Sequence, residues 1–298
     1  MTALASGAWK GIVCVVVAGL CFAMLDSTAK VVVASVPVLM VLWVRYLMQA
    51  VFSTVLLLPR HGASLFRPRH PWLQLLRGAL LSVTTMLALW SLRFLPVGEF
   101  TAIVMVTPLT VTVLAVVLLR DHVVRLQWVL IIGGFVGTIC IVRPGGEVFG
   151  WPAVSALACM AGNSAFQLLT SHLARTENAA TTHFLSGWVG AIVMTLALPF
   201  AWSSVDTAVL WFMMVTMGVL ASVGHFLLTL AYRYAPASTL MPYLYCHVGF
   251  AVLAGWIVFA HVPDGWSLTG IGLIAISGAC SAWLTARSRR TPAMAPDP

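Results

Sequence analysis

The sequence predicts an all-α integral membrane protein with ten transmembrane helices in two inverted five-helix repeats. Three observations predict this fold: the composition, a series of apolar stretches and an internal repeat. Of the 298 residues, 61% are hydrophobic and only 8% are charged, whereas an ordinary soluble domain has about 25% charged residues. The surface of a water-soluble domain would need far more charge. Soluble, disordered, collagen-like and disulfide-scaffold classes of protein are therefore excluded.

Ten apolar stretches are each long enough to cross the hydrocarbon core of a bilayer as a helix. Helices are expected because lipid offers no partner to an unpaired backbone group, and because these stretches lack the alternation of transmembrane barrel strands. The first stretch is too long for a signal peptide, so we expect it to be retained as a helix. The expected spans are residues 11–34, 37–58, 72–94, 97–119, 125–143, 150–174, 179–200, 207–231, 236–260 and 265–286.

The Lys and Arg residues are distributed unevenly between the two sides of this arrangement. If the N-terminus lies in the cytoplasm, all but four of the 16 Lys and Arg residues fall at cytoplasmic ends, the four being Lys30, Arg45, Arg93 and Arg143. This bias follows the positive-inside rule and predicts that both termini are cytoplasmic. The net charge of +8 is thus a topology signal, and no basic run with interleaved aromatic residues indicates nucleic acid as a partner.

The chain also repeats itself at an offset of 140 residues, where Gly78 aligns with Gly218 and Arg93 with Arg233. Each half holds five spans, an odd number, so the second half must be inverted relative to the first. Inverted repeats are a recurring plan of secondary transporters. The expected units are a first repeat over residues 1–143, a second repeat over 150–286 and a basic, Pro-rich tail over 287–298, with a boundary at residues 144–147.

Several local patterns resemble the EamA-type branch of the drug/metabolite transporter superfamily. They are FAMLDSTAK in the first span, WVRY in the second, LLRG at the start of the third, LRFLPVGEFTAIVMVTPL and LLRDHV around the fourth, GGFVGTICIVRPG in the fifth, and APASTLMPYLYCHVGFAVLAGW with VPDGWSLTGIGLI around the ninth and tenth. The resemblance covers nearly the whole chain. One departure is that the family often has Glu at the ends of the fourth and ninth spans, where this chain has Asp121 and His261.

The resemblance implies a metabolite transporter of the bacterial inner membrane. Family members are similar to exporters of amino acids and related compounds, and some relatives import S-adenosylmethionine or riboflavin. Because transporters with inverted repeats bind substrate near the bilayer midplane between the halves, a small-molecule substrate is expected there.

Three charged residues inside the first two spans are candidates for substrate binding. Asp26 lies about 6 Å outward of the centre of the first span, Lys30 follows on the same helical face, and Arg45 lies near the middle of the second span. Intramembrane charges are costly and usually face a partner or a watery cavity. One interpretation is a polar anchor for a charged substrate, with Asp26 as a proton carrier. The other is a self-neutralising pair of Asp26 with Lys30 or Arg45 that fixes helix packing.

Polar residues of the sixth span form a second candidate group. Asn163 and Gln167 are one helical turn apart near the centre of that span, which is the inverted counterpart of the first span. They are interpreted either as substrate ligands or as hydrogen-bond partners between helices.

The ninth span is the richest in candidate residues. Pro242 interrupts its hydrogen-bond ladder, and Tyr243, Tyr245 and His247 follow. At the offset of 140 residues, Met105 corresponds to Tyr245, and Pro108 likewise interrupts the fourth span. Broken helices at a repeat interface mark binding sites in transporters; the alternative is a proline kink that only shapes the helix.

His225 in the eighth span and Trp90 in the third complete the candidate binding set. The alternative for His225 is a core residue that is hydrogen-bonded to its neighbours. The alternative for Trp90 is packing against other helices or contact with lipid. Arg77 is expected within snorkelling reach of the cytoplasmic surface. Arg93 and Glu99 bracket the outer turn between the third and fourth spans and are expected to pair there.

The sequence lacks a Walker P-loop, a nucleophile elbow and a His-Glu-x-x-His helix, and the Cys and His residues show no metal-binding spacing. ATP is therefore not the direct energy source, and an enzyme, a cofactor and a metal are not expected. The predicted function is secondary active transport of a small metabolite, an amino acid or a derivative, by export through alternating access. The rivals are an uptake transporter for S-adenosylmethionine or riboflavin and a structural membrane protein without solute flux. Any oligomeric state is compatible with this interpretation.

Overall fold

In the computed structural model, every regular element among the described residues is a helix, which confirms the predicted all-α class. The structure describes residues 2–107, 109–111, 113–114, 125–142, 150–173, 176–234, 240 and 243–288. Pro108, Asp121, Pro242, the expected repeat boundary and most of the tail lie outside these residues. The described helices are α1 (Thr2–Val33), α2 (Val38–His61), η1 (Gly62–Phe66), α3 (Pro71–Phe94), α4 (Val97–Val104), α6 (Arg125–Val142), α7 (Trp151–Leu173), α8 (Ala179–Ala197), η2 (Leu198–Phe200), α9 (Ala208–Tyr234), α11 (Cys246–Phe259) and α12 (Gly265–Ser288).

The length and apolar character of these helices are those of a multi-pass membrane protein. Within the described ranges, seven helices are long and apolar enough to cross a membrane. They coincide with the expected spans one to three and five to eight. Three shorter apolar helices, at Val97–Val111, Cys246–Phe259 and Gly265–Ser281, coincide with the expected spans four, nine and ten.

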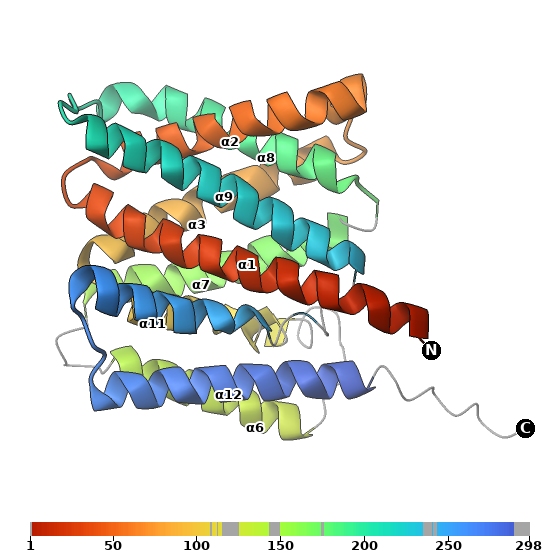
Figure 1. The fold of residues 1–298 in the computed structure, drawn as a ribbon, viewed down its shortest axis with the longest axis vertical. Helices are drawn as coiled ribbons and strands as arrows, with labels where there is room; N and C mark the ends of the chain where they lie inside the picture. Colours follow the sequence, from red (N-terminus) through yellow and green to blue (C-terminus); the bar gives the residue numbers. More distant parts are fainter. Residues whose placement is uncertain are drawn as a thin grey trace, which may run out of the picture.

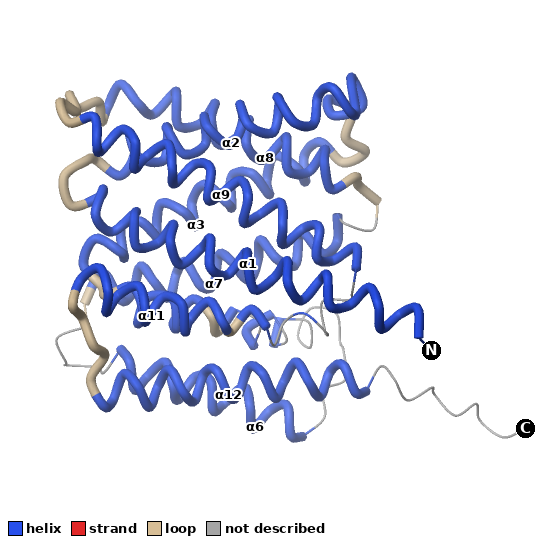
Figure 2. Tube along the Cα trace, in the orientation of Figure 1, coloured by secondary structure: helices blue, strands red, loops and turns tan. Residues whose placement is uncertain are grey.

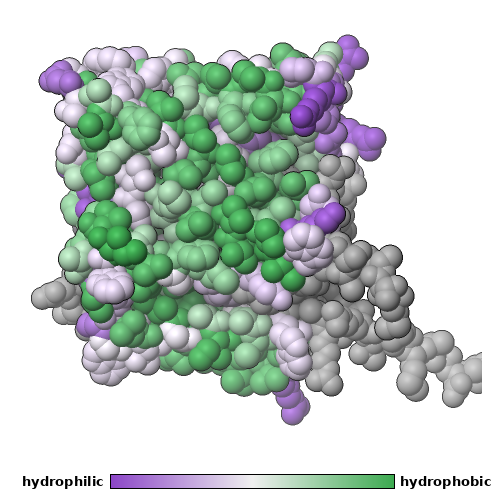
Figure 3. Space-filling model, in the orientation of Figure 1, coloured by the Kyte–Doolittle hydropathy of each residue, from purple (hydrophilic) through white to green (hydrophobic). Residues whose placement is uncertain are grey.

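Figure 3 shows a face that is mostly hydrophobic between two ends where hydrophilic residues gather. A soluble protein rarely exposes so large an apolar surface, whereas a lipid-facing surface needs one. Five tryptophans at the expected span ends are all exposed, as an interfacial aromatic belt requires; they are Trp9, Trp72, Trp151, Trp202 and Trp266.

The helices lie side by side, with α1 beginning and α12 ending at the same end of the molecule (Figures 1 and 2). We call this the terminal end, and we call the opposite end, where α1, α3 and α11 finish, the far end. α1 packs against α9 and α11, α3 against α7 and α8, α2 against α8 and α9, and α6 against α12. Most of the buried apolar side chains belong to one continuous core that joins these helices.

Local sequence signals set the helix boundaries. Pro37 and Pro96 directly precede α2 and α4, and Pro71 opens α3; at a helix start the missing N–H of proline costs no hydrogen bond. Asn178 caps α8 by accepting a hydrogen bond from Ala180 N at 2.9 Å. Asp264 accepts one from Ser267 N at 2.8 Å at the start of α12. Such caps satisfy amides that have no partner within the helix.

Two helices are interrupted at equivalent positions of the sequence repeat. α4 ends at Val104 and is followed by Met105, while Tyr245 directly precedes α11. The chain forms turns at both residues. Met105 and Tyr245 correspond to each other at the offset of 140 residues, so both described interruptions lie three residues from the prolines that the sequence analysis identified.

Candidate functional site

The intramembrane carboxylate Asp26 of α1 faces α11, not another residue of its own helix. Asp26 Oδ2 lies 3.3 Å from His247 Nε2, and the two side chains are 17% and 8% exposed. The close approach of the helices is possible because Gly19, on the same face of α1, lies against the backbone of His247. The expected pairing of Asp26 with Lys30 or Arg45 is therefore wrong: its partner comes from the ninth expected span, which a helical spacing rule within α1 could not find.

Aromatic contacts join a third helix to this pair. The ring of Phe22, one turn before Asp26, contacts the ring of His247 with centroids 5.9 Å apart and that of His225 on α9 with centroids 5.0 Å apart. The structure thus brings together three residues that the sequence nominated separately: Asp26, His225 and His247. We call them, with Phe22, the α1–α9–α11 cluster. The sequence analysis missed Phe22, although its spacing of four residues from Asp26 places both on one face.

Lys30 lies one turn beyond Asp26 and makes different contacts at the far end. Its Nζ donates hydrogen bonds to Leu95 O at 2.7 Å and Leu92 O at 3.1 Å, and it lies 5.8 Å from the centroid of the Phe259 ring. The two carbonyls belong to the end of α3, where a cation also interacts favourably with the helix dipole. Lys30 therefore ties α1 to the end of α3.

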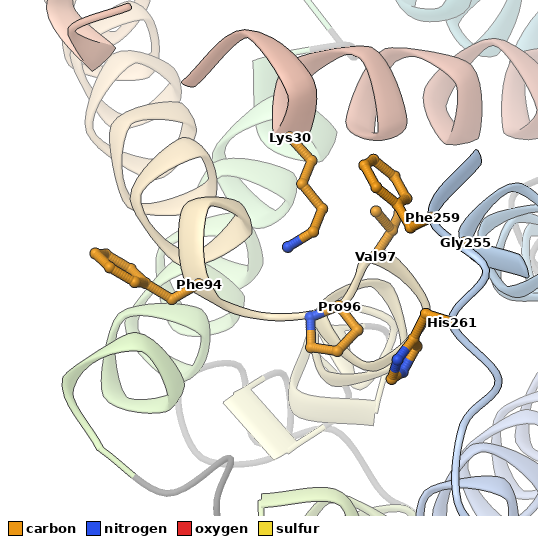
Figure 4. A pocket seen from close by; sticks show the side chains of 7 residues that line it. All are labelled: Lys30, Phe94, Pro96, Val97, Gly255, Phe259 and His261. Carbon is orange, nitrogen blue, oxygen red and sulfur yellow. The ribbon is translucent and has the colours of Figure 1, made fainter. Parts of the chain in front are cut away.

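Figure 4 shows the pocket at this end, with Lys30 and His261 directed into it between Phe94, Pro96 and Phe259. Its volume is about 220 Å³. Its lining residues come from the ends of α1, α3 and α11, the start of α4 and the segment after α11.

Glu99 and His261 form another carboxylate–histidine contact, at the far end. Glu99 Oε1 lies 3.0 Å from His261 Nε2; Glu99 is 3% exposed and His261 39%. The expected pairing of Glu99 with Arg93 is wrong, because Glu99 points into the bundle from the first turn of α4, whereas the Arg93 guanidinium lies over the Phe94 ring. The signal that could have found this contact is His261 itself, which stands where the family often has Glu.

Two arginines are buried inside the bundle. Arg77 on α3 donates hydrogen bonds from Nε to Thr170 Oγ1 at 2.8 Å, and from an NH group to Thr182 O and Ser186 Oγ; its guanidinium lies 4.5 Å from the centroid of the Phe166 ring. The expectation that Arg77 snorkels to the surface is wrong, because α7 and α8 supply acceptors inside the bundle. Arg45 on α2 is 6% exposed, lies beside the Tyr46 ring, and its Nε has no partner among the described residues.

Asn163 and Gln167 lie on one face of α7. At 100° per residue, this face falls between Cys159 and Phe166, which contact α3, and Met160, which contacts the segment after α4. Both side chains are partly buried, and neither has a hydrogen-bond partner among the described residues. They are therefore directed between α3 and α4 toward the interior, with free polar groups.

The remaining candidate binding residues lie apart from the α1–α9–α11 cluster. Tyr245 is 7% exposed, and its hydroxyl lies against Gly278 of α12 without a described hydrogen-bond partner. Met105 packs against the main core at the end of α4. Tyr243 is 38% exposed. Trp90 is not brought to the cluster: it lies in an exposed stripe of α3 that also contains Val83, Met86 and Phe94.

The described residues contain no group of three His, Cys, Asp or Glu side chains that could hold a metal ion. The chemistry available among the described residues is therefore that of two carboxylate–histidine contacts, three cations and the amides of Asn163 and Gln167. These groups can bind a polar molecule and hold or release a proton.

Comparison with known proteins adds independent observations. The model of the EamA-like transporter family matches residues 9–143. A riboflavin transporter of Vibrio cholerae is 28% identical over 289 residues, which cover 94% of this chain and 96% of that protein. An S-adenosylmethionine uptake transporter of Rickettsia conorii is 26% identical over 75% of this chain and 76% of its own length. A pseudopaline exporter of Pseudomonas aeruginosa is 24% identical over 90% of this chain and 94% of its own.

Among the solved structures, a crystal structure of another protein is similar in fold to this chain. It superposes with a TM-score of 0.67 at 16% sequence identity, over 96% of this chain and 99% of the other. The likeness supports the helical architecture along the whole chain.

Proposed function

The chain carries an EamA-like transporter domain of the drug/metabolite transporter superfamily over residues 9–143, and on that premise we propose that it is a secondary active transporter of a small metabolite. The substrate is an amino acid or a derivative, and the direction is export from the cytoplasm across the bacterial inner membrane. The named relatives transport small molecules and none is an enzyme by name. The three shorter apolar helices complete ten spans, with both termini in the cytoplasm.

Helix packing supports two inverted repeats, over residues 1–143 and 150–286. If spans one to five correspond to spans six to ten, the α1–α9 contact corresponds to α7–α3, α1–α11 to α7–α4, and α2–α9 to α8–α3; all six pairs are observed. The α2–α8 and α6–α12 contacts each correspond to themselves.

The same correspondence extends to individual residues. Gly78 of α3 lies against Val189 of α8, and its counterpart Gly218 of α9 lies against Met48 of α2. Random packing would not reproduce a helix-pair pattern and a glycine contact together, so an approximate twofold relation between the halves is the simplest account.

The observation that carries the proposed mechanism is the Asp26–His247 pair. It joins α1 of the first repeat to α11 of the second, next to the interrupted start of α11, and such a site between repeats is where transporters bind substrate. Asp26 and His247 would exchange a proton when substrate binds, because a carboxylate and an imidazole at 3.3 Å can share one charge or separate two. Arg45, Asn163 and Gln167 would bind polar groups of the substrate.

Alternating access would then involve the two ends of the bundle. Lys30 with α3, and Glu99 with His261, hold α1, α3, α4 and α11 together at the far end. Opening toward that side would have to break these contacts. The interruptions at Met105 and Tyr245 would let the far halves of the fourth and ninth spans move.

A second candidate substrate is riboflavin, taken up instead of exported. It is favoured by one observation: the riboflavin transporter of Vibrio cholerae matches this chain over nearly the full length of both proteins. The S-adenosylmethionine transporters match a smaller part.

Counterflow into proteoliposomes tests the proposal. Purified protein is reconstituted, preloaded with unlabelled substrate and supplied with labelled amino acids, riboflavin or S-adenosylmethionine in turn. We expect saturable exchange of an amino acid, which the Asp26→Asn variant should reduce. Exchange of riboflavin alone would establish the second candidate. Folded protein that exchanges none of the panel would reject both and favour a structural membrane protein.

A further inference from the structure

A second pocket lies away from the proposed transport site, at the terminal end of the molecule. It has a volume of about 460 Å³ and lies between the end of α2, the start of α8 and the last turns of α9. α2 packs against both α8 and α9, and the pocket opens where these helices end. None of the residues of the α1–α9–α11 cluster lines it, and Figure 3 shows hydrophilic residues gathered at this end.

The polar wall of this pocket is positive. Arg60, at the end of α2, is exposed and has no acidic partner among the described residues. The pocket also contains the start of α8, where the Asn178 side chain already accepts from Ala180 N; the helix dipole there still favours an anion. The acidic residue nearest in sequence, Glu177, does not line the pocket; its Oε1 accepts a hydrogen bond from His70 N at 2.8 Å.

Two histidines add polar groups to the wall of this pocket. His183, on α8, is 8% exposed and lines the pocket beside the helix start. His61 also lines the pocket, with Nδ1 bound to Leu57 O at 3.3 Å, which leaves Nε2 as the free ring nitrogen.

The remaining wall is apolar and lies deeper in the membrane. Phe226 and Leu230 are one turn apart on α9, about 12 and 6 Å before its last residue, and Phe226 is 42% exposed. The polar groups, in contrast, lie at the helix ends. A ligand that matches both walls has an anionic group at the membrane surface and an apolar chain that extends toward the bilayer centre.

We propose that this pocket binds an anionic phospholipid, with the phosphate between Arg60 and the start of α8 and an acyl chain against Phe226 and Leu230. Basic pockets between helix ends are suited to such headgroups. Two features favour a lipid over a free anion: the apolar part of the lining is larger than the polar part, and Phe226 and Leu230 extend it along α9 away from the helix ends. The site is independent of the transported substrate.

Binding of phosphatidylglycerol to the full chain tests this proposal. Native mass spectrometry of detergent-purified protein would measure the affinity for phosphatidylglycerol and for phosphatidylcholine. We expect phosphatidylglycerol to bind more tightly, and the Arg60→Gln variant to weaken it about tenfold through loss of a charge-assisted hydrogen bond. Arg60→Lys, which keeps the positive charge, should lose less affinity for phosphatidylglycerol than Arg60→Gln.

Arg69→Gln is the matched control, because Arg69 is exposed in the same region but does not line the pocket; it should change the affinity less than about twofold. If Arg60→Gln and Arg69→Gln lost the same affinity for phosphatidylglycerol, the proposed site would be rejected in favour of a general attraction of the lipid to the basic surface. Equal binding of the two lipids would overturn the anionic headgroup. If millimolar inorganic phosphate displaced bound phosphatidylglycerol as effectively as added lipid does, the lipid assignment would be overturned. Each readout is independent of transport, so failure of the proposed function would leave it unchanged.

Discussion

Asp26 and His247, from different repeats, form a carboxylate–imidazole contact in which both side chains are largely buried. Asp26 is 17% exposed and His247 8%. A charge in such an environment is costly unless it is paired, so under the proposed mechanism the contact between these two groups would change when substrate binds.

Replacing Asp26 by Asn should therefore remove the pH dependence of transport. The amide keeps the size of the side chain but can neither release a proton nor stabilise the protonated His247. The measurement is the initial rate of substrate exchange in proteoliposomes between pH 5.5 and 8.5, for the natural sequence and the variant. Asp206→Asn, which makes the same chemical change at an exposed position between η2 and α9, should keep the natural profile. An unchanged pH profile in active Asp26→Asn protein would falsify the proton-carrier role.

At the scale of helices, glycines determine how closely neighbouring elements approach. A Cβ added to Gly78 would lie 2.6 and 2.8 Å from Val189 Cγ1 and Cβ, distances that real Cβ atoms do not adopt. Gly218 is equally confined, with Met48 Cγ at 3.0 Å from the added atom. Small residues at such contacts let membrane helices pack through their backbones.

Gly78→Ala and Gly218→Ala should each destabilise the protein by about 1–3 kcal/mol, the usual cost of overpacking a core. If the repeats are equivalent, the two variants should lose similar stability. Thermal unfolding of detergent-purified protein would measure this. Gly272→Ala is the control, because a Cβ at this position of α12 meets no atom within 4 Å. Losses confined to one of the two variants would contradict the equivalence of the α3–α8 and α9–α2 contacts.

The elements also show what the sequence can and cannot predict. Hydropathy predicted the apolar described helices, because lipid requires continuous apolar spans, whereas η1, η2 and the caps at the helix starts were not predicted. The contacts of charged residues were predicted less well. Asp26, Glu99 and Arg77 each bind a residue that is distant in sequence, so their partners depend on how helices pack. His225 and His247 were singled out as intramembrane groups from the sequence, but their shared contact with Phe22 follows only from the tertiary structure.

At the scale of the whole molecule, the membrane topology depends on whether the three short apolar helices cross the membrane. α4, α11 and the apolar part of α12 are shorter than the seven long spans, yet they lie alongside them in one bundle (Figure 1). α11 packs against α1 and α4, and α12 packs along α6. Each short helix therefore packs against at least one of the seven long helices, which can bury part of its surface at the same depth in the membrane.

Ten spans place both termini on one side of the membrane, whereas seven place them on opposite sides. Reporter fusions distinguish these arrangements: a fluorescent protein that folds only in the cytoplasm and a phosphatase that is active only outside it. We expect the fluorescent reporter to be active at both the N- and C-termini, because the bias of Lys and Arg favours a cytoplasmic location for both. A phosphatase inserted at residues 203–206, between η2 and α9, should be active, and one inserted at residues 62–66 should be silent. Termini on opposite sides would remove the inverted repeat and with it the proposed site between the two halves.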